Sequence, residues 1–150
     1  AALRRLGLDA VWWLVSPQNP LKPKSSPLAE RTASARAQAH GARMVVTDLE
    51  QQLGCAFTYQ TLRALKRLYP GVAFTLIMGA DNLASFRKWR NWREVAEAVP
   101  VVIVSRHGAR AAHRLSAPRG WRYLNARLHR ESSTAIRSGR RAALAKPKRK

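Results

Sequence analysis

Short apolar runs alternate with longer segments of helical periodicity along this chain. The runs have the length of β-strands and end at polar residues, whereas the longer segments repeat apolar residues at intervals of three and four. Alternation of this kind is typical of an α/β domain with a mainly parallel sheet and flanking helices. The predicted strands are residues 10–16, 44–50, 72–79, 100–105 and 121–126.

The predicted helices are bounded by residues that begin or end helices. The chain opens in the last turns of one helix. Ser26 is an N-cap candidate, with Pro27 as the first helical residue, and this second helix continues to about His40. Thr58 caps a further helix, which ends at Leu68 and turns its leucines, Leu68 included, toward the core.

Two tryptophans lie in the segment after the third predicted strand, where two more helices are expected. Asp81 is the N-cap candidate of the first, and the second runs from about Asn91 to Ala98. Three-residue spacing places Trp89 and Trp92 on one side of a helix, and Trp92 is predicted to pack in the core. Trp89 lies between two basic residues and is a candidate for an exposed ring that stacks on a planar ligand. The alternative, in which both rings simply pack, stays open.

The composition is that of one globular domain. The chain has 150 residues, 46% of them hydrophobic, and a single cysteine, Cys55. One cysteine excludes an internal disulfide and offers no zinc-binding spacing, which favours a reducing compartment. The apolar runs are far shorter than the roughly 20 residues that cross a bilayer. We therefore expect a cytoplasmic protein without a membrane partner. Its single domain is expected to span residues 1–140.

The charge is the extreme feature of the composition. The chain carries 28 Lys and Arg against 8 Asp and Glu, which is a formal net charge of +20. Such an excess attracts polyanions, so a nucleic acid and a phosphate-rich small substrate are both candidate partners. The basic residues spread along the whole chain and become dense only in residues 141–150, which we predict to be a disordered basic tail.

The segment ESSTAIRSG, residues 131–139, has the composition of an anion-binding helix start. Serine and threonine oxygens accept hydrogen bonds from the free amides of a first helical turn, where the positive end of the helix dipole also lies. Arg137 follows Ser133 by one turn on the same face. Phosphate is the obvious anion. A structural cap with a solvent-facing arginine is the alternative.

Polar segments follow several of the predicted strands, namely SPQNPLKP, GADN, SRHG and ESSTAIR. Ligands of open α/β sheets bind outside the carboxyl ends of the strands, so these segments are expected to share one edge. Gly79 permits close approach of a ligand to the backbone, and Asp81 can accept from ribose hydroxyls. Arg106 and Arg137 can neutralise phosphate. Taken alone, Gly79 to Asp81 is equally an ordinary strand-to-helix turn with an aspartate cap.

No residue pattern indicates a metal held by protein ligands or covalent catalysis. The four histidines lie apart along the chain and lack the spacing of metal ligands. Neither a Walker loop nor GxGxxG occurs, and the serines lack a nucleophile elbow. An enzyme with this sequence is expected to work by positioning its substrates and neutralising their charge.

Several segments together resemble one enzyme family. In this order and spacing, VWWLVSPQNPLKP, FTYQTL, MGADNLASFRKWRNWREV, VVIVSRHG and ESSTAIRSG are similar to the bacterial nicotinate-nucleotide adenylyltransferases. This family belongs to the nucleotidyltransferase superfamily, whose fold is Rossmann-like. The resemblance extends to about Arg140, and its most specific parts are the GADN-to-tryptophan segment and SSTAIR.

The resemblance implies a reaction in NAD biosynthesis. Nicotinate mononucleotide and ATP would give deamido-NAD and pyrophosphate, by in-line attack of the mononucleotide phosphate on the α-phosphorus of ATP. No covalent intermediate is needed. Mg²⁺ bound with the ATP phosphates, together with basic side chains, would offset the repulsion between the two anions.

The resemblance also implies roles for particular residues. The ATP side comprises the strand-end turn, a basic residue near the ATP and the SSTAIR motif, which are Gly79, Asp81, Arg106, Ser132, Ser133, Thr134 and Arg137. Arg137 is the implied catalytic residue. The mononucleotide side comprises Asn19, Lys22, Thr58, Thr61 and Trp89, with the Trp89 ring on the nicotinate ring.

The sequence departs from this family at its beginning. The family opens with a Gly-rich strand-to-helix turn that carries an HxGH signature, whose histidines contact the reacting phosphates. The chain as given starts in the helix that should follow this turn, and HGARAAH, residues 107–113, has another spacing. We therefore expect a fold without its first strand and little adenylyl transfer by this 150-residue chain alone. Near-normal turnover would contradict this expectation.

Two other functions stay open. A basic nucleic-acid-binding protein would use the charge and the KPKRK tail, although no RNP, KH, zinc-finger or helix-turn-helix pattern occurs. A sister adenylyltransferase would act on another phosphorylated acceptor.

Overall fold

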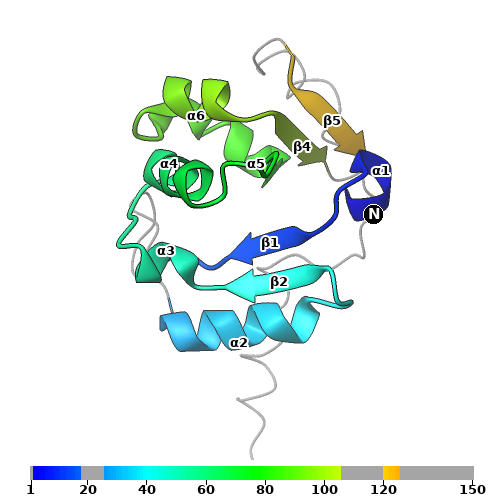
Figure 1. The fold of residues 1–150 in the computed structure, drawn as a ribbon, viewed down its shortest axis with the longest axis vertical. Helices are drawn as coiled ribbons and strands as arrows, with labels where there is room; N and C mark the ends of the chain where they lie inside the picture. Colours follow the sequence, from blue (N-terminus) through cyan, green and yellow to red (C-terminus); the bar gives the residue numbers. More distant parts are fainter. Residues whose placement is uncertain (1, 18–25, 106–119, 126–150) are drawn as a thin grey trace, which may run out of the picture.

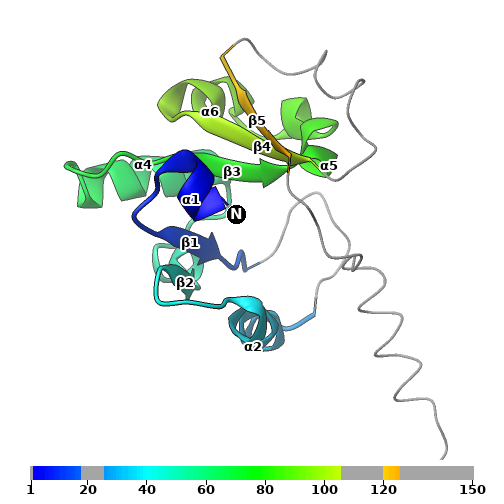
Figure 2. The same ribbon diagram turned by 90° about the vertical axis from the view of Figure 1, so that its right-hand side faces the viewer.

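The computed structural model describes residues 2–17, 26–105 and 120–125. Over these ranges, helices pack around parallel strands (Figure 1, and Figure 2 for the view turned by 90°). In chain order the elements are α1 (Ala2–Leu6), β1 (Val11–Leu14), α2 (Leu28–Gln38), β2 (Met44–Thr47), α3 (Leu49–Gln52), α4 (Thr58–Leu68), β3 (Leu76–Gly79), α5 (Ala80–Leu83), a 3₁₀ turn (Phe86–Lys88), α6 (Trp92–Ala98), β4 (Val101–Ser105) and β5 (Arg122–Asn125).

Every strand pair among the described residues is parallel, as the sequence predicts. β1 pairs with β2, and Val11 lies opposite Met44. β4 lies between β3 and β5, and Leu76 of β3 lies opposite Val101 of β4. These strands form a two-stranded and a three-stranded sheet, and β1 lies between β2 and the larger sheet in both ribbon views (Figures 1 and 2). Within each sheet the carboxyl ends therefore meet at one edge.

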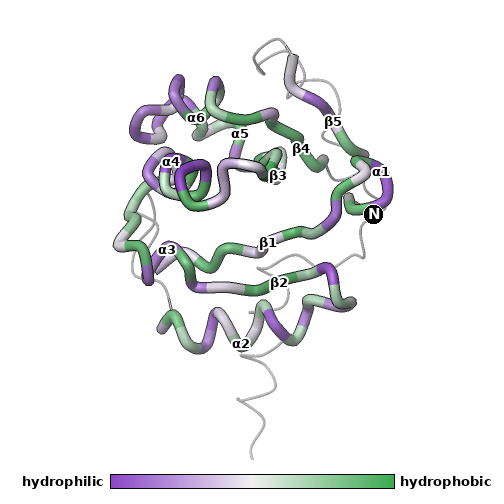
Figure 3. The backbone as a smooth tube through the Cα atoms, viewed as in Figure 1, coloured by the Kyte–Doolittle hydropathy of each residue, from purple (hydrophilic) through white to green (hydrophobic). Residues whose placement is uncertain are grey.

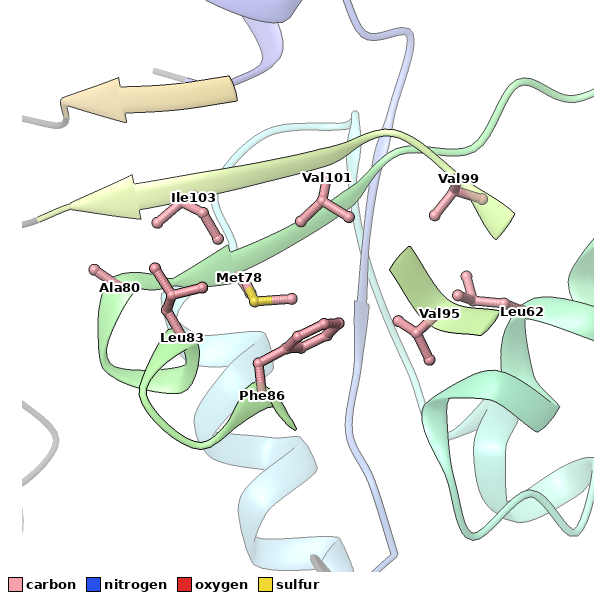
Figure 4. Close-up of a cluster of buried hydrophobic side chains, with 9 residues drawn as sticks. All are labelled: Leu62, Met78, Ala80, Leu83, Phe86, Val95, Val99, Val101 and Ile103. Carbon is pink, nitrogen blue, oxygen red and sulfur yellow. The ribbon is translucent and has the colours of Figure 1, made fainter. Parts of the chain in front are cut away.

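The core packs against the three-stranded sheet (Figure 4). Val95 and Ile103 are fully buried, and Phe86 is 2% exposed. The consecutive residues Val101, Val102 and Ile103 of β4 are all buried, so both faces of this strand are covered, and an unbroken apolar run suits such a strand. The buried cluster consists of Leu62, Met78, Ala80, Leu83, Phe86, Val95, Val99, Val101 and Ile103.

Helix α4 has the predicted bounds, but its last leucine does not face the core. Leu62 and Leu65 are buried, whereas Leu68 is 49% exposed. Each step of three residues turns an α-helix by about 300°, so a side chain drifts by about 60° per step, and two steps carry Leu68 off the buried face. Figure 3 shows the resulting mixture of hydrophobic and hydrophilic residues along α4.

Strand β1 is less buried than the sequence predicts. Trp12 and Trp13 are 37% and 38% exposed, so the expectation of a buried strand is wrong here. Among the described strands, β1 pairs with β2 alone, and one neighbour leaves large side chains partly uncovered. The Trp12 ring packs edge-on against Tyr69 and Phe74, with centroid distances of 5.4 and 6.4 Å.

All five strands are shorter than predicted, and β2 and β3 show that a strand extends only as far as it is paired. β3 starts at Leu76, whose N–H donates to the Pro100 carbonyl at 2.9 Å, rather than at residue 72. β2 ends at Thr47, and α3 begins two residues later. None of the helices in the described ranges is long and apolar enough to cross a membrane.

The helix starts also differ from the prediction. Pro27 precedes α2 rather than opening it, so the N-cap lies one residue later than Ser26. Thr58 is the first helical residue of α4 and does not cap it. The Gln60 side chain does so instead, because its Oε1 accepts from the N–H groups of Ala56 and Phe57 at 3.0 and 3.1 Å.

Candidate functional site

The candidate site lies where β3 ends and α5 begins. Asp81 is the second residue of α5, and Gly79 is the residue before this helix, so the prediction of Asp81 as the N-cap is wrong. The backbone of Gly79 is extended, with φ −72° and ψ 150°, which any residue adopts. A Cβ at this position would collide with the Asp81 carboxylate, so that side chain would have to turn away.

The Asp81 carboxylate is available to a ligand. Its side chain is exposed and lies over Gly79, and among the described residues no donor lies within hydrogen-bonding distance of it. An exposed carboxylate accepts readily from hydroxyl groups. The geometry therefore suits an acceptor for a sugar hydroxyl at the end of β3.

Trp89 and Trp92 pack on the same core residue without sharing a helix. Trp89 follows the 3₁₀ turn, and the left-handed Asn91, with φ 51°, separates it from α6. The centroids of both rings lie close to that of Phe86, at 5.3 Å for Trp89 and 6.0 Å for Trp92. Each ring is half-buried. The prediction of one shared helix is wrong. Both rings pack against the core and part of each ring stays exposed, so the stacking of Trp89 on a ligand stays a prediction.

Thr61 is buried and its hydroxyl is used inside the protein. The side chain is 1% exposed, and its Oγ1 donates to Glu50 Oε1 at 3.0 Å. The buried Thr61 therefore supports the site from within, because its hydrogen bond holds Glu50 of α3 against α4. It does not offer its hydroxyl to a mononucleotide. Thr58, one turn earlier, is half-exposed at the start of the same helix. The sequence analysis gave Glu50 no role, because it placed this residue at the end of the predicted strand 44–50, whereas the structure places it in α3.

Replacing Thr61 with valine is expected to lower the free energy of unfolding by about 1–3 kcal/mol. The substitution keeps the shape of the side chain but leaves the Glu50 carboxylate, which is 8% exposed, without the donor from Thr61. Urea unfolding followed by circular dichroism measures the change. Thr58→Val is the matched control, since that side chain is half-exposed on the same helix. Equal losses in the two variants would contradict the proposed role of the buried pair.

The remaining predicted site residues lie outside the described ranges. These are Asn19, Lys22, Arg106, Ser132, Ser133, Thr134 and Arg137, and their roles stay predictions. No group of three or more His, Cys, Asp or Glu comes together within the described part of the chain. Asp81 is the one acidic side chain that the sequence analysis assigns to the ligand.

Two basic side chains lie over the Trp92 ring. The one ion pair found among the described residues joins Arg63 to Glu94. Arg63 donates from Nε to Oε1 of Glu94 and from Nη2 to Oε2, the latter at 3.0 Å. The guanidinium groups of Arg87 and Arg93 lie 5.9 and 4.8 Å from the centroid of the Trp92 ring. Because a ring, unlike a carboxylate, does not compensate the positive field of a guanidinium group, these two arginines favour an anion near Trp92.

A family model described as cytidylyltransferase-like matches residues 1–139 of the chain. A protein of Cereibacter sphaeroides, described as a probable nicotinate-nucleotide adenylyltransferase, is 51% identical over 143 residues, which cover 95% of this chain and 74% of that protein. A protein of Roseobacter denitrificans with the same description is 42% identical over 160 residues, which cover 91% of this chain and 80% of its own.

A solved structure shares the fold. It is the Plasmodium falciparum nicotinic acid mononucleotide adenylyltransferase complexed with NaAD, which matches with a TM-score of 0.60 at 14% identity. The match covers 86% of this chain and 65% of that one. At this identity the likeness shows the fold alone, an α/β arrangement of parallel strands with flanking helices.

Proposed function

This chain belongs to the cytidylyltransferase-like family and, within it, to the nicotinate-nucleotide adenylyltransferases, and from that premise we propose its reaction. The adenylyl group of ATP is transferred to nicotinate mononucleotide, which yields deamido-NAD and pyrophosphate. The observation that carries the proposal beyond membership is the exposed Asp81 carboxylate, which lies over Gly79 at the end of β3, where ligands of α/β sheets bind.

The chemistry is one in-line displacement. An oxygen of the mononucleotide phosphate attacks the α-phosphorus of ATP, and a new phosphorus–oxygen bond forms. The bond from the α-phosphorus to the bridging oxygen breaks, and pyrophosphate leaves with the electron pair. Since no protein group is bonded covalently, the protein has to bring two anions together and stabilise the charge of the transition state.

The ATP side of the proposed site centres on the turn after β3. Gly79 lets the nucleotide approach the backbone, and Asp81 accepts a hydrogen bond from a ribose hydroxyl. Arg137 acts as the catalytic residue by stabilising the phosphate charge that develops. The residues proposed to hold the phosphates with it are Arg106, Ser132, Ser133 and Thr134.

The residues proposed for the mononucleotide side come from the segment before α2, the start of α4 and the segment before α6. The accessible part of the Trp89 ring stacks on the nicotinate ring, and Thr58 lines the site at the start of α4. Asn19 and Lys22 complete this side. Thr61 supports it from within the protein rather than by direct contact.

Mg²⁺ enters this scheme as part of the substrate, bound to the phosphates of ATP. It supplies positive charge to the phosphate oxygens when bound. The protein contributes orientation and cationic side chains around the metal–nucleotide complex.

Thermal unfolding in the presence of separate ligands tests the proposal. Mg-ATP and nicotinate mononucleotide, each at 100 times its dissociation constant, are expected to raise the melting temperature by about 5–10 °C. Nicotinamide mononucleotide and a short RNA, at the same concentrations, are expected to stabilise less. Deamido-NAD formation, measured by chromatography, reports the reaction itself.

The RNA arm decides between the two classes of function. Stabilisation by RNA alone, falling steeply between 50 and 200 mM salt, would overturn the proposal in favour of a nucleic-acid-binding protein. Stabilisation by another phosphorylated acceptor, and not by nicotinate mononucleotide, would replace the acceptor and keep the adenylyl transfer.

A further inference from the structure

Two arginines and two aromatic rings join the start of α4 to the turn that carries Trp89. The Arg90 guanidinium lies over the ring of Phe57, with 5.3 Å between its central carbon and the ring centroid. The Phe57 ring stacks on that of Tyr59, at a centroid distance of 6.2 Å and an interplanar angle of 20°. The Arg63 guanidinium lies over the Tyr59 ring at 5.5 Å. These four residues form an arginine–aromatic cluster.

The arginine–aromatic cluster is closed through Glu94. Arg63 donates to both carboxylate oxygens of Glu94, which lies in the first turn of α6. The same carboxylate accepts from Nδ2 of Asn91 at 3.5 Å, and Asn91 directly follows Arg90 in the chain. The contacts therefore run from α4 to α6, two helices that lie side by side, and back (Figure 1). Exposed contacts of these kinds are weak singly, but a closed network of them limits the motion of each member.

The contact between Phe57 and Arg90 lies next to two residues of the proposed site. Phe57 is the N-cap residue of α4, and Thr58 is the first residue of this helix. Arg90 directly follows Trp89, and the two share a hydrogen-bonded turn, in which the Trp92 N–H donates to the Trp89 carbonyl at 3.2 Å. A contact between the Phe57 ring and the Arg90 guanidinium therefore fixes where Trp89 lies relative to Thr58.

We propose that Arg90, through its contact with Phe57, is a positioning residue for the mononucleotide half of the site, a role that rests on the proposed function. In that function the Trp89 ring stacks on the nicotinate ring, and Thr58 lines the same half. A ligand that touches both residues binds more tightly when their separation is set in advance, because less freedom is lost on binding. The cluster does not include the turn after β3, so its effect is expected on one substrate only.

Variants separate the position of the Trp89 turn from the charge of Arg90. Phe57→Leu removes a ring from the cluster and keeps every charge, whereas Arg90→Met removes the guanidinium and keeps an apolar stem. Arg67→Met is the matched charge control. Arg67 lies in the last turn of α4, is exposed and makes no side-chain hydrogen bond, ion pair or ring contact among the described residues. Isothermal titration calorimetry with nicotinate mononucleotide and with Mg-ATP gives two dissociation constants for each variant.

Phe57→Leu and Arg90→Met are each expected to weaken nicotinate mononucleotide binding by about three- to tenfold and Mg-ATP binding by less than about twofold. Phe57→Tyr, which keeps the ring, is expected to bind the mononucleotide within about twofold of the unaltered chain, as is Arg67→Met.

Two results would overturn the positioning role. Native-like mononucleotide binding by Phe57→Leu, together with weaker binding by Arg90→Met, would show that Arg90 acts through its own charge. Equal weakening of both ligands would show a general loss of structure. If Phe57→Leu fails to fold, as judged by circular dichroism, the comparison of Arg90→Met with Arg67→Met carries the test.

A second readout keeps this inference separate from the proposed function. If the unaltered chain binds no nicotinate mononucleotide, the proposed function fails, and the contact itself is judged by urea unfolding. The double variant of Phe57→Leu and Arg90→Met is expected to unfold at the same urea midpoint as Phe57→Leu, because the leucine has already removed the ring on which Arg90 lies. Fully additive shifts of the midpoint would show that Arg90 and Phe57 do not stabilise each other.

Discussion

An alanine in place of Phe86 is expected to lower the free energy of unfolding by about 3–5 kcal/mol. The ring is 2% exposed and lies at the centre of an aromatic cluster. Its centroid lies 5.3 Å from that of Trp89, 6.0 Å from that of Trp92 and 4.9 Å from that of Trp121. Truncation removes buried apolar surface and leaves a cavity that three large, separately anchored rings cannot easily fill.

The loss is large because Phe86 joins segments that are distant in sequence. Trp89 follows the 3₁₀ turn, Trp92 opens α6 and Trp121 directly precedes β5. Without the phenyl ring, the packing that sets the position of Trp89 is lost as well. The same variant is therefore expected to weaken stacking of any planar ligand on Trp89, in addition to destabilising the fold.

Urea unfolding followed by circular dichroism measures the stability change, by linear extrapolation to zero denaturant. Phe57→Ala is the matched control, because Phe57 is half-buried and stacks on Tyr59 at a centroid distance of 6.2 Å. Its expected loss is less than half of that for Phe86. Similar losses in both variants would show that the cluster around Phe86 is not the centre of the core.

Gly79→Ala is expected to raise the dissociation constant of Mg-ATP by about 10- to 100-fold, with little change in stability. The backbone at Gly79 has φ −72° and ψ 150°, so alanine fits the conformation. The new Cβ would instead collide with the Asp81 carboxylate and force that side chain to rotate away. If Asp81 accepts from the ribose, as proposed, a methyl group two residues earlier in the chain removes this contact indirectly.

A double-mutant cycle tests this route. Asp81→Ala is expected to weaken Mg-ATP about as much as Gly79→Ala, and the two together are expected to do little more, because the carboxylate can be lost only once. Gly71→Ala is the control, since a Cβ at Gly71 meets no atom within 4 Å. Calorimetric titration gives the constants. Additive effects in the double variant would rule out displacement of Asp81 as the cause.

The family resemblance and the Rossmann-like α/β class predicted from the sequence are confirmed by the comparisons. Element prediction succeeded where burial is nearly complete. The run at 100–105 contains β4 (Val101–Ser105), with both faces covered, and α4 ends at Leu68 as predicted. Such segments show their structure locally, because every residue of a covered strand, or one face of a packed helix, has to be apolar.

Side-chain environments were predicted less well, because they depend on neighbours from other parts of the chain. Trp12 and Trp13 were predicted to be buried but are 37% and 38% exposed, because the number of neighbouring strands determines how much of a side chain is covered. Thr61 was predicted to contact a ligand, yet its hydroxyl donates a hydrogen bond to Glu50, which is eleven residues away in sequence. The left-handed Asn91 separates two tryptophans that a helical period would align.

The sequence by itself determined the fold class, the family and the types of group available to two anionic substrates, because apolar periodicity and short motifs are local properties of the chain. Only the tertiary structure decided how those groups are held. The Asp81 carboxylate lies over Gly79, Phe86 gathers three tryptophans, and the Arg90 guanidinium lies over the Phe57 ring. These are contacts between residues whose neighbourhood exists only after the chain has folded, so no local pattern encodes them.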